Sequence, residues 1–124
     1  MFRRPMTVIF TLAITLAVTT PAYAYPRSVH KWEPVIEQKM CELHIPRYQR
    51  PWLKAACLKA INGESRGNPH ARNGQYAGLL QFGRSWGGAW RYDAHKSIHR
   101  FCRVYKLQGK RGIRRHWRAT IGRL

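Results

Sequence analysis

Apolar side chains recur every three or four positions in three stretches of this chain, the pattern of helices with one buried face. The first stretch covers residues 32–43 and the second residues 51–64. Pro34 and Pro51 fall in opening turns, where the missing proline N–H is tolerated. The third stretch follows Asp93, which we interpret as its N-cap. One face of this third helix would hold Ala94, Ile98, Phe101, Cys102 and Tyr105.

The connecting segments are rich in turn-forming residues. Residues 44–50 contain Pro46 and are predicted to form a loop. Asn73-Gly74 is typical of a tight turn between two short extended pieces. The pattern predicts a small, mainly α domain of the α+β class, with three helices and a short hairpin or loop region.

The first 24 residues have the features of a secretory signal peptide. Arg3 and Arg4 precede a mostly apolar run over residues 6–18, and the small-residue site Ala22-Tyr23-Ala24 follows. The run is shorter than the roughly 20 apolar residues of a membrane-spanning helix. We therefore expect a leader over 1–24, one domain over 25–124, and a secreted or periplasmic, monomeric protein.

The charge balance indicates a polyanionic partner. The chain has 23 Lys and Arg against 5 Asp and Glu, a net charge of +18. Residues 25–124 keep 21 of the basic and all 5 acidic side chains, a net charge of +16. An anionic cell wall or membrane surface would attract such a protein. Nucleic acid is disfavoured as a partner because the sequence contains no recognisable nucleic-acid-binding motif and has a predicted export signal.

Glu64 is the candidate catalytic residue. It ends the apolar stripe of the second predicted helix and is bracketed by Gly63 and Gly67. Partial burial there would disfavour the charged form and raise its pKa, as a general acid near neutral pH requires. The alternative is an ordinary surface glutamate at a helix end.

Residues 63–86, reading GESRGNPHARNGQYAGLLQFGRSW, resemble the lysozyme-like lytic transglycosylases and the related resuscitation-promoting-factor domains. The resemblance implies a lysozyme-like fold and peptidoglycan glycan strands as substrate. It further implies that Glu64 is the catalytic acid and base, that Ser65 lies beside it in the same first motif, and that Gly78 and Gln81 belong to a second motif. Ser65, Gly78 and Gln81 would then contact the substrate. The tyrosine-asparagine third motif of many soluble members is not found.

Aromatic residues near the second motif suit a sugar-binding cleft, because flat rings pack on the apolar faces of pyranoses, although core packing explains many of them equally well. We expect Tyr76 to line the cleft, and Phe82 and Phe101 to lie in the core. Trp86 fits either environment and is kept as a candidate substrate-binding residue.

The scarcity of acidic residues favours a non-hydrolytic transglycosylase over a hydrolase. Hydrolytic glycosidases usually use two carboxylates, and after Glu64 only Asp93 follows, which we interpret as a helix cap. One carboxylate is enough if the muramoyl 6-hydroxyl is the nucleophile and a 1,6-anhydro sugar forms. The alternatives are a lysozyme-type muramidase and a secreted cationic antimicrobial protein that binds walls or membranes without turnover.

The remaining candidate chemistry concerns cysteine and histidine. In an exported protein Cys57 and Cys102 are the preferred disulfide pair of the three cysteines, and the alternative is that they are small buried hydrophobes. His95 and His99 lie one helical turn apart, but no third ligand is evident. We expect no metal and no cofactor.

Overall fold

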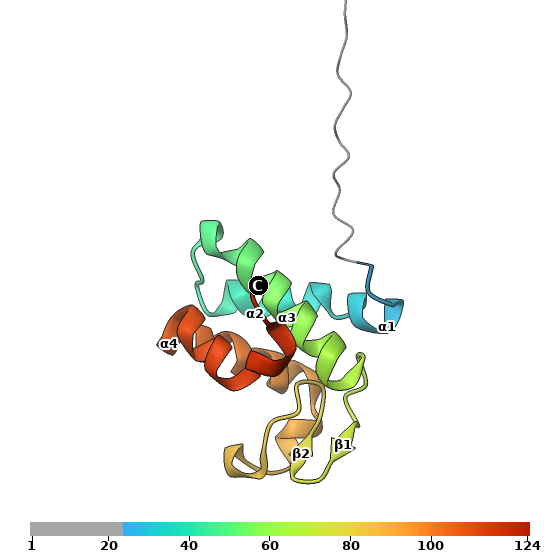
Figure 1. Ribbon diagram of the computed structural model, residues 1–124. Coiled ribbons are helices and arrows are strands. Elements are labelled where there is room, and N and C mark those ends of the chain that lie inside the picture. Colours follow the sequence, from blue (N-terminus) through green and yellow to red (C-terminus); the bar gives the residue numbers. More distant parts are fainter. Residues whose placement is uncertain (1–23) are drawn as a thin grey trace, which may run out of the picture.

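The computed structural model describes residues 24–124, so all but the last residue of the predicted leader lies outside the described part of the chain. Within it the protein is mainly helical with one small two-stranded sheet (Figure 1). The α-helices are α1 (Arg27–His30), α2 (Glu33–Glu42), α3 (Arg50–Ser65) and α4 (Ala94–Ile121). The strands are β1 (Arg72–Asn73) and β2 (Tyr76–Ala77), and short 3-10 turns occupy Arg47–Gln49, Arg84–Trp86 and Ala89–Tyr92.

The predicted helices are confirmed to within a few residues at their ends. Pro34 and Pro51 lie in the first turns of α2 and α3, and the Asp93 side chain caps α4 by accepting a hydrogen bond from the Lys96 amide at 3.0 Å. The predicted loop over 44–50 contains a 3-10 turn. Helix α1 has no counterpart in the prediction, because four residues are too few to show a helical period.

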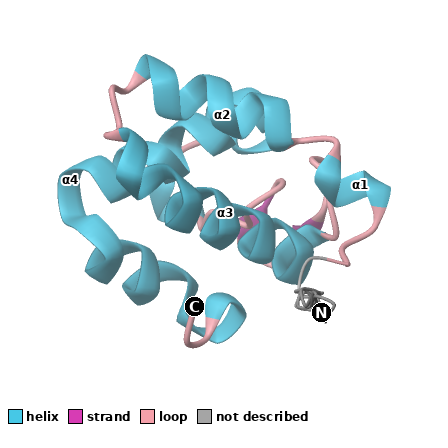
Figure 2. Ribbon diagram, turned by 90° about the horizontal axis from the view of Figure 1, so that it is seen from above, coloured by secondary structure: helices cyan, strands magenta, loops and turns pink. Residues whose placement is uncertain are grey.

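Helices α2, α3 and α4 pack against one another, and α3 contacts both of the others (Figure 2). The apolar stripe predicted for it is buried, and its members are Leu53, Ala56, Cys57, Ala60 and Ile61. Phe82 and Phe101 are also buried, as expected. The core therefore fixes α3 firmly and places its C-terminal turn, which carries Glu64, at the hairpin end of the molecule.

The hairpin forms where the Asn73-Gly74 turn predicts it. Strands β1 and β2 pair antiparallel, with Arg72 opposite Ala77 and Asn73 opposite Tyr76. Gly74 has φ +63°, a left-handed conformation that a glycine in a tight hairpin turn supplies without strain.

Helix α4 changes direction at Gly109, whose backbone is not helical (φ 68°, ψ −163°). Its first half packs against α2 and α3, and its second half turns back toward the end of α3 (Figures 1 and 2). A second break follows at Trp117 (φ −123°, ψ 28°), and after the two breaks the last residues of the chain lie beside Glu64.

Candidate functional site

Glu64 lies in the last turn of α3, half-buried under the end of α4. The Thr120 hydroxyl donates a hydrogen bond to Glu64 Oε2. A Cβ added to Gly63 would lie 2.1 Å from the Thr120 methyl group, so the neighbouring glycine allows this close approach. Burial raises the pKa of Glu64 above its ordinary value, and the Thr120 hydrogen bond opposes part of that rise. A carboxyl group with a raised pKa keeps its proton to higher pH and can donate it.

Ser65, the neighbour of Glu64, connects the two motifs. Its hydroxyl donates to the Leu79 carbonyl at 2.7 Å, and the Gly67 amide donates to the same hydroxyl at 3.2 Å. Ser65 therefore holds the end of α3 against the second motif. The resemblance implies substrate contact for this residue, and the structure gives it this joining contact.

The turn after Glu64 is held from the other side by Ser28 of α1 and by Trp32, which precedes α2. Ser28 Oγ donates to the Arg66 carbonyl at 2.9 Å and Trp32 Nε1 to the Gly67 carbonyl at 3.1 Å. A Cβ on Gly67 would lie 2.0 Å from the Ser28 carbonyl oxygen. The α3 terminus is thus fixed by contacts with two separate segments, and the carboxyl group of Glu64 is presented from a constrained backbone.

Gly78 and Gln81 shape the second motif. Gly78 has φ +89°, and an added Cβ would lie 1.6 Å from the Arg91 carbonyl oxygen, so no side chain fits. The Gln81 amide nitrogen donates to the carbonyls of Ala71 and Gly78 at 3.1 and 2.9 Å. Its amide oxygen accepts no hydrogen bond from the described residues, so it is the atom of this side chain that could accept from a sugar hydroxyl.

A pocket of about 360 Å³ brings together three of the predicted substrate-binding residues, Tyr76, Gln81 and Trp86. Tyr76 is 46% exposed, which suits a ring that contacts a ligand at the rim. Ser65, Gly78 and Glu64 do not line this pocket. The same pocket is walled by residues of α4 that the sequence did not indicate: Arg115, His116 and Trp117. Partial burial and the nearby Arg115 lower the pKa of His116, which favours its neutral form.

Three of the pocket residues, Phe82, Trp86 and Trp117, belong to an aromatic cluster around Phe82. The Phe82 ring centroid lies 5.1 Å from Trp86, 5.0 Å from Trp90 and 5.4 Å from Trp117, within the range of favourable aromatic pairs. Trp86 packs against the core and also lines the pocket. Its position therefore combines core packing with exposure to the pocket.

Trp117 and Thr120 also belong to the site without having been predicted from the sequence. The Trp117 indole N–H donates to the buried Leu80 carbonyl at 3.0 Å and so attaches α4 to the second motif. Thr120 is the only threonine after residue 24, but it lies 56 positions from Glu64 and beyond the segment that resembles the family. No local signal relates either residue to the site.

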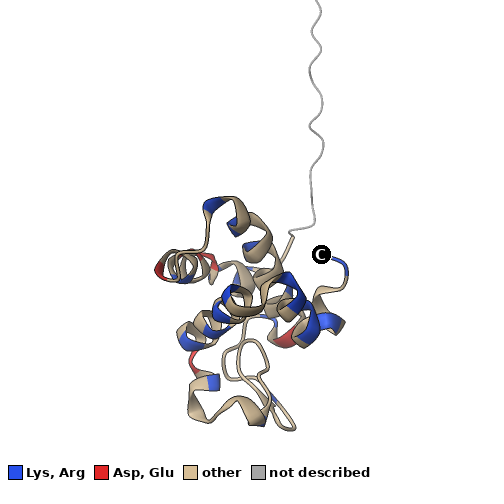
Figure 3. Ribbon diagram, turned by 90° about the vertical axis from the view of Figure 1, so that its left-hand side faces the viewer, with Lys and Arg blue, Asp and Glu red and all other residues tan. Residues whose placement is uncertain are grey.

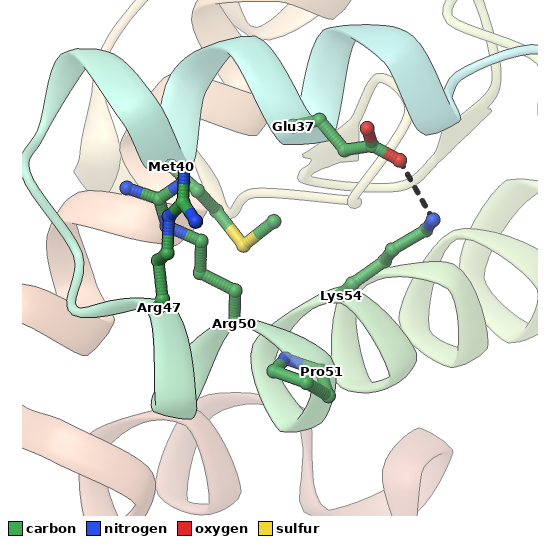
Figure 4. A pocket seen from close by; sticks show the side chains of 6 residues that line it. All are labelled: Glu37, Met40, Arg47, Arg50, Pro51 and Lys54. Carbon is green, nitrogen blue, oxygen red and sulfur yellow. Dashed lines mark hydrogen bonds and ion pairs between the residues drawn. The ribbon is translucent and has the colours of Figure 1, made fainter.

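The other four carboxylates of the chain all lie among residues 24–124, and each is engaged elsewhere. Lys54 binds Glu33 at 2.9 Å and Glu37 at 2.7 Å. Figure 4 shows the second of these pairs across a separate pocket of about 480 Å³. Lys39 binds Glu42 at 3.3 Å, and Asp93 caps α4.

The predicted disulfide between Cys57 and Cys102 is absent from the structure, in which both are free, buried thiols. They lie close enough for Cys102 to contribute to the raised pKa of Cys57, although burial is the larger cause. Burial also raises the pKa of Cys102 to about 12. The helical phase correctly predicted that the two residues lie at one helix interface. There they pack as small hydrophobic side chains.

Two features do not occur within residues 24–124. No group of three His, Cys, Asp or Glu side chains there could hold a metal ion. In the same range, no helix combines the length and the apolar character needed to cross a membrane.

Comparisons of the chain with protein-family models, with curated proteins and with solved structures find no match. The chemistry of the site therefore has to be inferred from its own geometry and from the motif in residues 63–86.

Proposed function

We propose that this protein is a lysozyme-like lytic transglycosylase that cleaves the bond between N-acetylmuramic acid and N-acetylglucosamine in peptidoglycan. The observation that carries the proposal is the state of Glu64, a half-buried carboxyl group with a raised pKa in a chain whose other carboxylates are all engaged elsewhere. The motif resemblance supplies the substrate.

The reaction needs one carboxyl group that changes role. Protonated Glu64 donates its proton to the glycosidic oxygen, and the N-acetylglucosamine side departs with a free 4-hydroxyl group. The Glu64 carboxylate then takes the proton of the muramoyl 6-hydroxyl as that oxygen attacks C1. The product is a 1,6-anhydromuramoyl end, no water is consumed, and Glu64 is protonated again.

The pocket beside the second motif would hold the sugar chain. Tyr76 and Trp86 offer aromatic surface for pyranose faces, and the free amide oxygen of Gln81 can accept a hydroxyl hydrogen bond. Since Glu64 lies outside the lining of this pocket, the pocket would hold sugars next to the cleaved bond. The predicted leader over 1–24 would deliver the enzyme to the wall outside the cytoplasm.

The test is mass spectrometry of sacculi digested by the protein comprising residues 25–124. Anhydromuramoyl ends are expected. Reducing ends would instead indicate a muramidase, and the absence of released fragments would indicate a cationic binder; either outcome contradicts the proposal.

The matched variants are Glu64→Gln and Glu42→Gln. Glutamine keeps the shape of Glu64 and can still accept from Thr120, but it cannot donate an acidic proton, so release should fall about 10²- to 10⁴-fold. Glu42 is exposed on α2, and its replacement removes the same charge with little expected effect. Equal activity of the two variants would show that Glu64 is not the acid.

A further inference from the structure

We infer that the face of α4 formed by Arg111, Arg114, Arg115 and Arg118 binds the carboxylates of the peptides carried on the glycan strand. We call this face the arginine groove; it rests on the proposed function and names a second part of the substrate. The four side chains line a depression of about 710 Å³. They lie at helical spacings of three and four and therefore project from one side of α4.

The groove carries unbalanced positive charge. All four arginines are exposed, and no carboxylate side chain in the described residues pairs with any of them. Arg114 Nη2 donates to the main-chain oxygen of Leu124 at 3.2 Å, and its guanidinium also lies 5.6 Å from the centre of the Trp52 ring, so Arg114 is the member of the groove that is engaged within the protein. Arg111 and Arg118 make no such contacts within residues 24–124. Basic residues recur along α4, which contains no Asp or Glu, and Figure 3 shows that basic positions outnumber acidic ones over the described residues.

A second pocket that contains arginines differs from the arginine groove in its charge balance. The pocket in Figure 4 also contains two arginines, Arg47 and Arg50, but Glu37 and Lys54 form an ion pair within it, and Arg50 Nε donates to the Ile45 carbonyl at 2.7 Å. Part of its positive charge is therefore already satisfied inside the protein. The arginine groove has no acidic member and remains available for an external anion.

The position of the groove indicates which anion it would bind. Arg115 lines both the groove and the pocket with Tyr76, Gln81 and Trp86, so the two depressions share a wall. A sugar in that pocket would place its own substituents at the edge of the groove. In peptidoglycan those substituents are short peptides with free carboxylates, and the guanidinium fork binds carboxylates in bidentate fashion.

The composition of the groove argues against two other polyanions. Its lining contains no aromatic ring on which a nucleic-acid base could stack. It also contains no apolar side chain that could enter the acyl region of a membrane. Carboxylates need neither.

The experiment uses soluble glycan strands with their peptides intact and the same strands stripped by an amidase. The test variant is Arg111→Gln/Arg118→Gln, since these two side chains form no hydrogen bond or ion pair within residues 24–124 and do not line the sugar pocket. The matched control is Lys96→Gln/Arg103→Gln, which removes two exposed charges from the first half of α4. The wild-type protein should show a KM for peptide-bearing strands about tenfold lower than for stripped strands, at similar kcat.

The test variant should lose this KM preference and keep its kcat, while the control variant keeps both. A wild-type protein with equal KM values on the two substrates, or a test variant that retains the preference, would overturn the assignment. So would a test variant that loses binding to poly(glycerol phosphate), to phospholipid vesicles or to single-stranded DNA while its preference for peptide-bearing strands is unchanged.

A binding measurement separates this inference from the catalytic proposal. Calorimetry with a disaccharide-tetrapeptide and with the peptide-free disaccharide needs no turnover. If the wild-type protein cleaves neither strand but binds the disaccharide-tetrapeptide through Arg111 and Arg118, the proposed activity fails and the groove assignment stands. If it cleaves both strands with equal KM, the activity stands and the groove assignment fails.

Discussion

Substitution of Trp117 should lower the unfolding free energy strongly, because its indole N–H joins α4 to the second motif. In Trp117→Phe the Leu80 carbonyl stays buried and loses its donor, which costs about 1–3 kcal/mol. The smaller ring also removes two carbon atoms from contact with Phe82 and Phe101, about 1.5 kcal/mol at 0.8 kcal/mol for each buried carbon. We expect a total loss of about 3 kcal/mol.

The assay is urea and thermal unfolding followed by circular dichroism. For a domain of this size, about 3 kcal/mol corresponds to a fall in Tm of roughly 12–24 °C. Trp52→Phe is the matched control. Trp52 is partly buried and lies beside Tyr105, but its indole N–H donates to no acceptor in the described residues, so its replacement should cost only the lost contacts.

The comparison between the two variants is decisive. If Trp117→Phe and Trp52→Phe lower the unfolding free energy equally, the hydrogen bond to Leu80 does not stabilise the fold. A loss below about 1 kcal/mol in Trp117→Phe would contradict the whole estimate, including its packing part.

Three further predictions follow from the site. Thr120→Val removes the hydrogen bond that lowers the pKa of Glu64, so the fall in activity with rising pH should move to higher pH; a shift to lower pH would contradict the assigned role. Gly78→Ala should cost at least about 2 kcal/mol in urea unfolding, because alanine is strained at φ +89° and its Cβ would overlap a facing carbonyl; near-wild-type stability would refute this. In native protein at pH 8, iodoacetamide should label exposed Cys41 and leave Cys102 unmodified, as peptide mapping would show; equal labelling would mean that Cys102 is accessible.

The parts of the fold governed by local rules could be predicted from the sequence. Helix α3 follows from its apolar spacing and from Pro51 in the first turn, and α4 begins where Asp93 caps it. The hairpin follows from Asn73-Gly74. Each of these signals acts over a few residues, so no knowledge of the tertiary structure is needed to recognise it.

The candidate site could be predicted only in part, because half of it comes from a distant segment. Glu64 and the pocket residues Tyr76 and Gln81 belong to the motif. Trp117, however, contacts Leu80 across 37 positions, and Thr120 contacts Glu64 across 56. Their contacts depend on the kink at Gly109, and a single glycine in a helical pattern does not specify the direction of the helix after it. The disulfide prediction failed for a related reason: helical phase places two cysteines at one interface without deciding whether they bond.

The kink at Gly109 has a consequence for how the length of the chain can vary. After it, one short stretch of α4 supplies the partner of Glu64, the indole that holds the second motif, and the arginine groove. Inserting or deleting one residue just after Gly109 would rotate the side chains beyond it by about 100° around the helix axis. All three features would be lost together. This stretch can therefore accept substitutions, but its number of residues has to stay fixed.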